Sequence, residues 1–200
     1  GHRESDLRAF QIAIERSQPG AIMSGYNKIN GEYAGGSHHL LNEVLKGTWG
    51  YKGYVMSDWG ATPEWEYALH GLDQESGAQA DRFMWSLDAE PFAEPLRQAY
   101  AEGKLPKERL SDMVRRILRS AYAVGIDKWE AAPAVDMARH NEIALEIARQ
   151  GIVLLKNENA LPLAADKPLK IAVIGGYAQQ GVISGTGSGA VAPVGGFAST

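Results

Sequence analysis

The sequence predicts an α/β fold in which short parallel strands are joined by helices. Residues 54–56 are an apolar stretch bounded by Gly53 and Gly60, as expected of a short buried strand. Segments with apolar residues at helical spacing alternate with further short apolar runs over residues 5–125. This alternation is typical of a parallel sheet with crossover helices.

Eight elements are predicted over the first 126 residues, and each rests on its own pattern. Leu7, Phe10 and Ile14 fall on one face of a helix, and Asn30-Gly31 is typical of a tight turn. The elements are, in order, a helix over 5–17, a strand over 21–24, a helix capped by Ser37 that carries Leu40, Leu41, Val44 and Leu45, the strand over 54–56, a helix that begins at 62–64, a weaker strand over 71–75, a helix over 88–100, and a helix from Ser111 to Gly125.

The pattern changes after Gly125. Residues 127–133 have the composition of a surface linker, and a helix is predicted over 141–149. Two apolar runs, 151–155 and 170–174, are predicted to be strands. We therefore expect a second α/β domain to begin in this part of the chain.

Composition limits the classes of function. The 200 residues carry a net charge of −4, with 44% hydrophobic and 22% charged residues, as in ordinary soluble domains. This mild acidity provides no attraction for nucleic acid or an anionic membrane, so neither is expected as a partner. The chain has no cysteine, which excludes disulfides, thiolate metal ligands and cysteine nucleophiles. It also begins without an initiator methionine or a signal-peptide pattern, so we expect it to come from within a longer protein.

Asp58 is the leading candidate for a functional residue. It directly follows the predicted strand 54–56, at the end where parallel strands hand over to loops that carry chemistry. Trp59 next to it offers a flat apolar face, which suits a sugar because sugars present C–H faces to stack and hydroxyls to hydrogen-bond. The alternative is that Asp58 only caps a following helix. The residues alone leave both interpretations open.

Other polar residues carry weaker signals. His38-His39 lacks a third ligand at useful spacing and is interpreted as a surface pair at a helix start, not as a metal site. Glu64 is expected in the first turn of a helix, whereas Asp73 and Glu75 are expected to support loops or the wall of a pocket. None of these three acids is nominated as a catalytic acid.

Several separated blocks resemble glycoside hydrolase family 3, the family of β-glucosidases and β-xylosidases. Gly25 stands where this family usually has serine, and Ser76-Gly77 replaces its usual Met-Pro. The blocks are MSGYNKING at 23–31, LLNEVL at 40–45, WGYKG at 49–53, VMSDW at 55–59, GLDQE at 71–75, GIVLLKN at 151–157 and IAVIG at 171–175. Their order and spacing together make the resemblance specific, and it covers nearly the whole chain.

The resemblance implies a fold and a domain division. Residues 1–126 would form the C-terminal part of a TIM-like (β/α)8 barrel, 127–140 a linker, and 141–200 the beginning of an α/β sandwich domain. It also implies a retaining, exo-acting β-glycosidase, specifically a β-glucosidase. Such an enzyme needs no cofactor and no metal, and its substrate would be a β-linked oligosaccharide or an aryl or alkyl glucoside. A periplasmic or secreted location is implied in the same way.

The resemblance also assigns residues. Asp58 matches the catalytic nucleophile, and Trp59 matches an aromatic residue that lines the sugar site. Met23 and Tyr26 match residues of the pocket for the non-reducing terminal sugar, and Ser188 matches a serine that the second domain lends to that pocket. The acid/base is expected to be a glutamate beyond Thr200.

Three alternatives remain open. A β-xylosidase of the same family would use the same residues, and a non-catalytic carbohydrate-binding relative would share only the fold. The third is a dinucleotide-binding oxidoreductase, because residues 185–190 fit G-x-G-x-x-A. Against it, residues 175–184 separate this motif from its strand, and 192–196 are a poor start for a helix.

Overall fold

The computed structural model describes residues 1–128, 130, 134–164, 166–176 and 178. The chain divides into two compact units, Gly1–Pro133 and Ala134–Thr200. Each unit is described by itself.

The centre of the first unit is a pair of parallel strands, β1 (Ala21–Met23) and β4 (Tyr54–Met56). They align so that Ile22 lies opposite Val55 and Met23 opposite Met56. Met56 also forms a parallel bridge with Gln74. Three passages of the chain therefore run side by side in the same direction, which confirms the predicted parallel arrangement.

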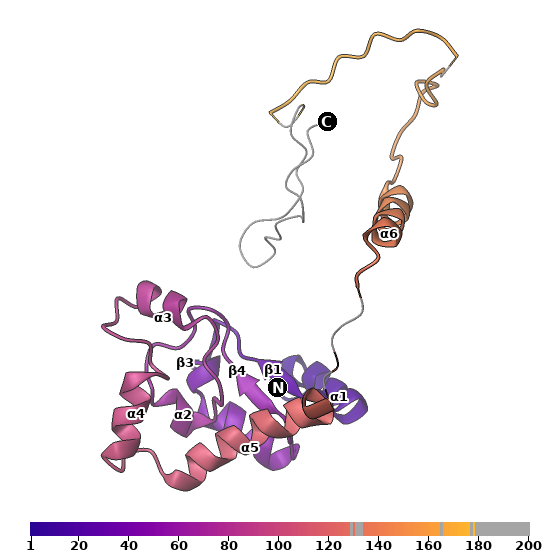
Figure 1. Ribbon diagram of the computed structural model, residues 1–200. Coiled ribbons are helices and arrows are strands. Elements are labelled where there is room, and N and C mark those ends of the chain that lie inside the picture. Colours follow the sequence, from indigo (N-terminus) through magenta and orange to yellow (C-terminus); the bar gives the residue numbers. More distant parts are fainter. Residues whose placement is uncertain (129, 131–133, 165, 177, 179–200) are drawn as a thin grey trace. The chain divides into compact units, whose positions relative to one another are not determined.

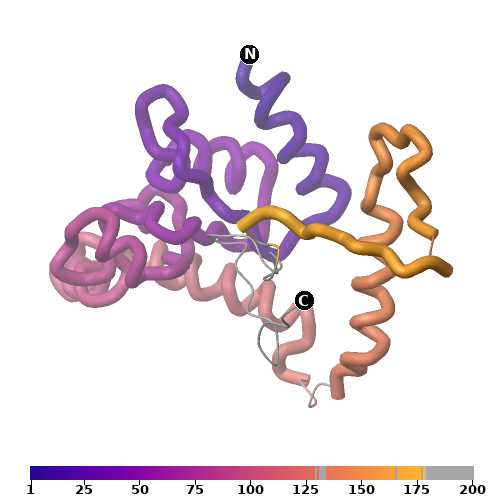
Figure 2. The backbone as a smooth tube through the Cα atoms, turned by 90° about the horizontal axis from the view of Figure 1, so that it is seen from above, coloured from indigo at the N-terminus to yellow at the C-terminus, as the bar shows by residue number. Residues whose placement is uncertain are grey.

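Helices surround this strand pair (Figure 1). They are α1 (Asp6–Ser17), η1 (Ala34–Gly36), the π-helix η2 (His39–Thr48), α2 (Tyr67–His70), α3 (Ala78–Met84), α4 (Glu94–Ala101), α5 (Lys107–Ala123) and η3 (Ile126–Lys128). Helices α1 and η2 lie next to each other (Figure 2), and both bury apolar side chains against Val55 of β4. A second cluster joins Ala68 of α2, Leu96 of α4 and Met113 of α5. Most of the apolar residues predicted for 5–17 and 40–45 are therefore buried in the core, whereas Phe10 is 55% exposed, contrary to the prediction.

A short hairpin follows β1. Strands β2 (Lys28–Ile29) and β3 (Glu32–Tyr33) are antiparallel. Asn30 and Gly31 between them have φ angles of 52° and 90°. These two residue types tolerate the left-handed region, so the turn forms where Asn-Gly predicted it.

Helix α5 is anchored to the strands by a set of charged side chains that we call the α5 network: Lys46, Asp73, Arg109, Asp112 and Arg116. Asp73 is 2% exposed, and its Oδ1 lies 2.7 Å from both Lys46 Nζ and Arg109 Nη2. Its Oδ2 accepts the backbone N–H of Val55 at 2.9 Å. Arg116 donates to Asp112 and to two backbone carbonyl groups just before β4. These charged groups therefore find their hydrogen-bond and ion-pair partners within the protein.

Four predicted elements differ from the structure in the first unit. The chain after Pro63 is not helical until α2, because Asp81 holds the backbone N–H of Thr62. Residues 71–75 form only one bridge, since the N–H groups of Asp73 and Gln74 both donate to Val55. The helix over 88–100 begins only at α4, where Pro95 occupies the first turn.

The start of α5 was predicted too late. Ser111 lies inside the helix, which begins at Lys107 after the extended Pro106. Proline can precede or begin a helix because its missing N–H is not needed there, and this signal outweighs the serine.

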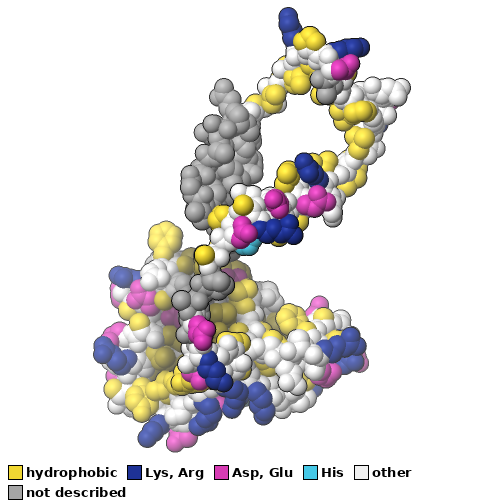
Figure 3. Space-filling view, turned by 45° about the vertical axis from the view of Figure 1, so that its right-hand side comes forward, with side chains coloured by type: hydrophobic (Ala, Val, Ile, Leu, Met, Phe, Trp, Pro, Cys, Tyr) yellow, Lys and Arg dark blue, Asp and Glu magenta, His cyan; other side chains and the backbone are white. Residues whose placement is uncertain are grey.

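In the second unit, α6 (Met137–Gly151) confirms and extends the predicted helix, and Asp136 caps it by accepting the N–H of Arg139 at 2.9 Å. The strands predicted at 151–155 and 170–174 are absent from the described residues of this unit. Their side chains are exposed along the chain, Leu155 by 91% and Ile174 by 92% (Figure 3). A strand forms only against a partner, and neither run has one among the described residues.

Over the residues that the structure describes, no helix combines the length and apolar character needed to span a bilayer.

Candidate functional site

Candidate residues from three passages of the chain meet at the carboxyl end of the strand pair. Met23 is the last residue of β1, Asp58 follows β4 by two residues, and Glu75 follows the bridge at Gln74. Because the three passages are parallel and in register, these residues emerge at the same edge. The position predicted for Asp58 is confirmed.

Asp58 begins a tight turn instead of a helix. Its Oδ1 accepts the N–H of Trp59 at 2.7 Å, and its backbone carbonyl accepts the N–H of Ala61. Gly60 completes the turn with a φ of 78°. The helix-cap interpretation is therefore wrong, since the residues after Asp58 are not helical. The carboxylate is half-buried at the mouth of the strand pair.

Tyr26 lies beside Asp58. Its hydroxyl donates to the backbone carbonyl of Trp59 and lies close enough to Asp58 for that side chain to act on its pKa. Partial desolvation, the Asp58 side chain and the charge of Asp81 raise the pKa of Tyr26 above its usual value. The phenol therefore stays protonated at neutral pH and is a stable donor next to the carboxylate.

Two large apolar side chains near the carboxylate are open to solvent. Trp59 is 54% exposed and Met23 is 57% exposed. Gly77 touches the Trp59 side chain so closely that a Cβ there would come within 2.6 Å of its Cδ1. The indole is thus backed by the chain on one side and free on the other, which leaves a face available for stacking.

The other acids near this edge have different surroundings. Asp73 belongs to the α5 network and is not accessible. Glu75 accepts the N–H of Phe92 at 2.8 Å, so both acids support neighbouring segments as predicted. Glu64 is exposed and not in a helix, contrary to the prediction. His38 and His39 both face Glu43 on the surface, with Nδ1–Oε distances of 3.7 and 2.5 Å.

The sequence analysis missed the contribution of α3. Asp81 is fully buried and its Oδ1 accepts the N–H of Thr62 at 2.6 Å. Just after α3, Trp85 donates its indole N–H to the carbonyl of Gly60 at 2.9 Å. The segment AQADRFM has no apolar periodicity, so its sequence does not predict a helix. The burial of Asp81 is visible only in the structure.

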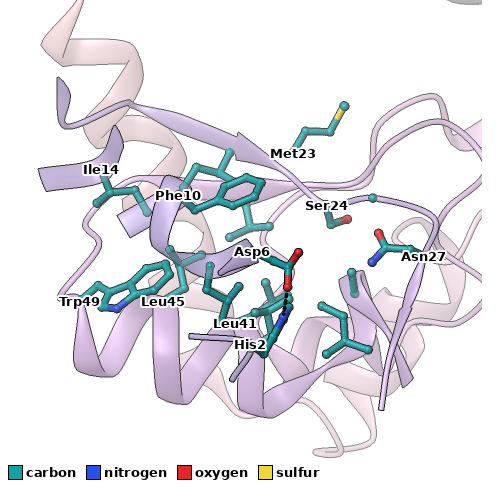
Figure 4. Close-up of a pocket in the computed structure, with 17 residues that line it drawn as sticks. His2, Asp6, Phe10, Ile14, Met23, Ser24, Asn27, Leu41, Leu45 and Trp49 are labelled. Carbon is teal, nitrogen blue, oxygen red and sulfur yellow. Dashed lines mark hydrogen bonds and ion pairs between the residues drawn. The ribbon is translucent and has the colours of Figure 1, made fainter. Parts of the chain in front are cut away.

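A separate apolar cavity of about 180 Å³ lies between α1, β1 and η2 (Figure 4). Phe10, Leu41 and Leu45 form its wall, while Met23 extends away from them. Neither Asp58 nor Tyr26 lines it. Since it contains neither of these residues, it is not the candidate site.

Asp58, Tyr26, Trp59 and Met23 thus come together at one edge. Ser188 lies outside the described residues. No group of three or more possible metal-ligating side chains occurs among the residues with a described placement.

The chain matches two models of one protein family. Residues 2–120 match the glycosyl hydrolase family 3 N-terminal domain, and residues 152–198 match the C-terminal domain of the same family. The first match alone covers more than half of the chain.

Individual proteins agree with the family models. A β-glucosidase from Bacteroides ovatus is 34% identical over 91% of this chain and 26% of its own length. An exo-α-(1→6)-L-arabinopyranosidase from Bifidobacterium breve is 33% identical over 96% of this chain and 25% of its own length. The structure of β-glucosidase 3B from Thermotoga neapolitana in complex with glucose is 37% identical, with a TM-score of 0.64 over 79% of this chain and 22% of that one. The chain therefore spans about a quarter of the length of the relatives it matches.

Proposed function

Because this chain belongs to glycoside hydrolase family 3, we propose that the whole protein containing it is a retaining, exo-acting β-glucosidase with Asp58 as its nucleophile. The observation that carries the proposal is the position of Asp58 at the carboxyl end of β4, beside the Tyr26 hydroxyl and the exposed Trp59. In this proposal residues 1–126 are the C-terminal part of a TIM-like barrel, 127–140 a linker and 141–200 the beginning of an α/β sandwich.

The chemistry requires an ionised nucleophile and a second, protonated carboxyl group. A carboxylate oxygen of Asp58 attacks the anomeric carbon, the bond to the leaving oxygen breaks, and that oxygen takes the proton of the acid. Water, activated by the same second group, then cleaves the glycosyl ester and frees Asp58. The second group is the glutamate expected beyond Thr200.

The residues around Asp58 have matching roles. Trp59 stacks on an apolar face of the terminal sugar, and Met23 lines the same pocket. The Tyr26 hydroxyl next to Asp58 helps to orient the attacking carboxylate. Ser188 is proposed to reach the sugar from the second domain.

The test is covalent trapping in the whole protein. A 2-deoxy-2-fluoro-β-glucoside with a good leaving group forms a long-lived ester on the nucleophile, and peptide mapping then locates it. We expect the label on Asp58. A label on another acid would keep the reaction class and remove Asp58 from its role.

Two variants sharpen the test. Asp58→Asn should lower kcat for an aryl β-glucoside by about three orders of magnitude or more, because the attacking carboxylate is lost. Glu64→Gln removes an exposed carboxylate from the same loop and is the matched control, expected within about twofold of the parent. The corresponding xyloside tests the β-xylosidase alternative. Sugar binding without turnover of either substrate would favour a non-catalytic relative.

A further inference from the structure

Glu75 and Asp81 form a carboxyl pair that the proposed mechanism does not use. Asp81 is fully buried in α3, and Glu75 lies half-buried in the segment that follows the bridge at Gln74. The two side chains lie close enough that each acts on the pKa of the other. Oε1 of Glu75 and Oδ2 of Asp81 are both buried, and neither has a hydrogen-bond partner within the described part of the chain. Two ionised carboxylates in this arrangement would have no donor between them.

The second oxygen of each carboxyl group, in contrast, accepts a hydrogen bond from a backbone N–H group. Asp81 Oδ1 accepts the N–H of Thr62 at 2.6 Å, and Glu75 Oε2 accepts the N–H of Phe92 at 2.8 Å. The pair therefore links the end of the turn that starts at Asp58 to the segment before α4.

Further bonds hold the same turn, which we call the 57–62 loop. Ser57 Oγ accepts the N–H of Ser76 at 2.9 Å, and Trp85 donates to Gly60 at 2.9 Å. Of these contacts, only the bond to Thr62 depends on an acid. Asp81 is therefore the one member of the pair that contacts the 57–62 loop directly.

Among the residues that the structure describes, no cation acts on the pKa of either group. The charged and titratable groups that face it are Glu90, whose charge acts on Glu75, and Tyr26, on which the charge of Asp81 acts. Arg82 lies near Glu90, with 4.0 Å between its Nη1 and Oε1 of Glu90. The ion pair of Arg82 is therefore with Glu90 and not with Glu75 or Asp81. Burial, the contact with Asp81 and the charge of Glu90 raise the pKa of Glu75 to about 7, although the N–H of Phe92 opposes this. Burial likewise raises the pKa of Asp81.

We propose that Glu75 and Asp81 share one proton and act as a positioning pair for the 57–62 loop, an inference that rests on the proposed role of Asp58 as nucleophile. The proton sits between Glu75 Oε1 and Asp81 Oδ2, so that a neutral Glu75 donates to an ionised Asp81. Asp81 then accepts the Thr62 N–H, which fixes the end of the turn that presents Asp58.

Loss of this proton places two negative charges against each other in a buried site. Their repulsion separates Glu75 from Asp81 and weakens the bond to Thr62. The attack by Asp58 should therefore slow above about pH 7, independently of the acid that protonates the leaving group.

The experiment uses the whole protein and 2,4-dinitrophenyl β-glucoside, whose leaving group needs no protonation. With this substrate the general acid does not contribute to the alkaline fall in kcat/KM. Glu75→Gln keeps an acceptor for Phe92 and gives Asp81 a permanent N–H donor. We expect it to retain the rate at pH 6 and to raise the ratio of rates at pH 8 and pH 6 by about threefold or more over the parent.

Glu90→Gln is the matched control, because it removes one negative charge next to Glu75 and no contact with the 57–62 loop. The pKa of Glu75 should then fall, so the loss of rate should move to lower pH, opposite to Glu75→Gln. Asp81→Ala should lower kcat about tenfold, through the lost Thr62 bond, with a smaller change in KM. Asp81→Asn should restore most of this kcat, since its amide accepts from Thr62 and donates to Glu75.

An unchanged pH profile in Glu75→Gln, or parental kcat in Asp81→Ala, would overturn the proposal. If Asp81→Ala does not fold, Asp81→Asn and Glu75→Gln decide. Infrared spectroscopy gives a readout that needs no activity: the difference between the spectra of the parent and Glu75→Gln at pH 6 should contain a protonated carboxyl band, to which the general acid, present in both proteins, does not contribute. A protein that shows this band but does not hydrolyse glycosides would refute the proposed function and leave the proton sharing established. A protein that hydrolyses glycosides but lacks the band would support the proposed function and refute the proton sharing.

Discussion

Asp73 and Glu75 lie two residues apart, and they satisfy their buried oxygens in opposite ways. In the α5 network, Asp73 is surrounded by Lys46, Arg109 and a backbone N–H, all at 2.7–2.9 Å. At the 57–62 loop, none of the described cationic side chains acts on Glu75, and its free oxygen has no hydrogen-bond partner among the described residues. One region holds its acid by counter-charges and the other by a proton.

The α5 network belongs to the scaffold of this unit, whereas the 57–62 loop belongs to the candidate site. The α5 network ties α5 to η2, to the backbone before β4 and to the middle of β4. The 57–62 loop carries half-buried Asp58 and exposed Trp59, and it depends on a group that titrates near pH 7. Mutations in the first region should act on stability, whereas those in the second should act on the reaction.

The largest effect is expected from Asp73→Ala. It leaves Lys46 and Arg109 buried without their common carboxylate, which costs about 3–5 kcal/mol in the free energy of unfolding. Denaturant unfolding of the whole protein measures it, with the transition of this unit followed separately. Asp112→Ala, in which a partly exposed acid of the same network is removed, is the control and should cost clearly less. Equal costs would mean that burial does not set the strength of the network.

The sequence predicted the two strands of the sheet and the position of Asp58, because apolar runs bounded by glycine are local signals. It also predicted α1 and the faces of η2, whose apolar spacing matches their burial. The predicted start of α5 was too late because two local signals disagreed. Ser111 is a typical helix cap, but the helix begins directly after Pro106.

The remaining errors have tertiary causes. Helix α3 has no apolar face, and it is held by contacts of Asp81, and of Trp85 just after it, with residues 19 and 25 positions earlier. The pairing of Glu75 with Asp81 likewise depends on two carboxyl groups meeting in space. The assignments of Met23, Tyr26, Trp59 and Ser188 came from the resemblance, and their roles stay predictions.

An intermediate effect is expected from Gly77→Ala, which acts on the loop instead of the network. Gly77 has a φ of 65°, and an added Cβ would lie 2.6 Å from Cδ1 of Trp59. The backbone strain costs about 1–2 kcal/mol, and the displaced indole should raise KM for an aryl β-glucoside several-fold. Gly103→Ala is the matched control, with a φ of 73° and open space around it, and it should show the strain without the change in KM. A normal KM in Gly77→Ala would remove Trp59 from the sugar site.

The smallest effect is a difference in how stability depends on pH. Since the pKa of Glu75 is raised from 4.5 to about 7, mainly by burial, the folded state binds this proton more tightly than the unfolded state. Its contribution to stability is present below pH 4.5 and is lost as the pH rises through about 7, by about 1 kcal/mol after allowance for its partial exposure. Burial lowers the pKa of Lys46 in the α5 network to about 8, so that group adds stability as the pH rises from 8 to 10.5. Unfolding curves of the parent and Glu75→Gln should therefore diverge between pH 4.5 and 7 and run parallel above it. Divergence confined to pH 8–10.5 would place the titrating group in the network and not at the loop.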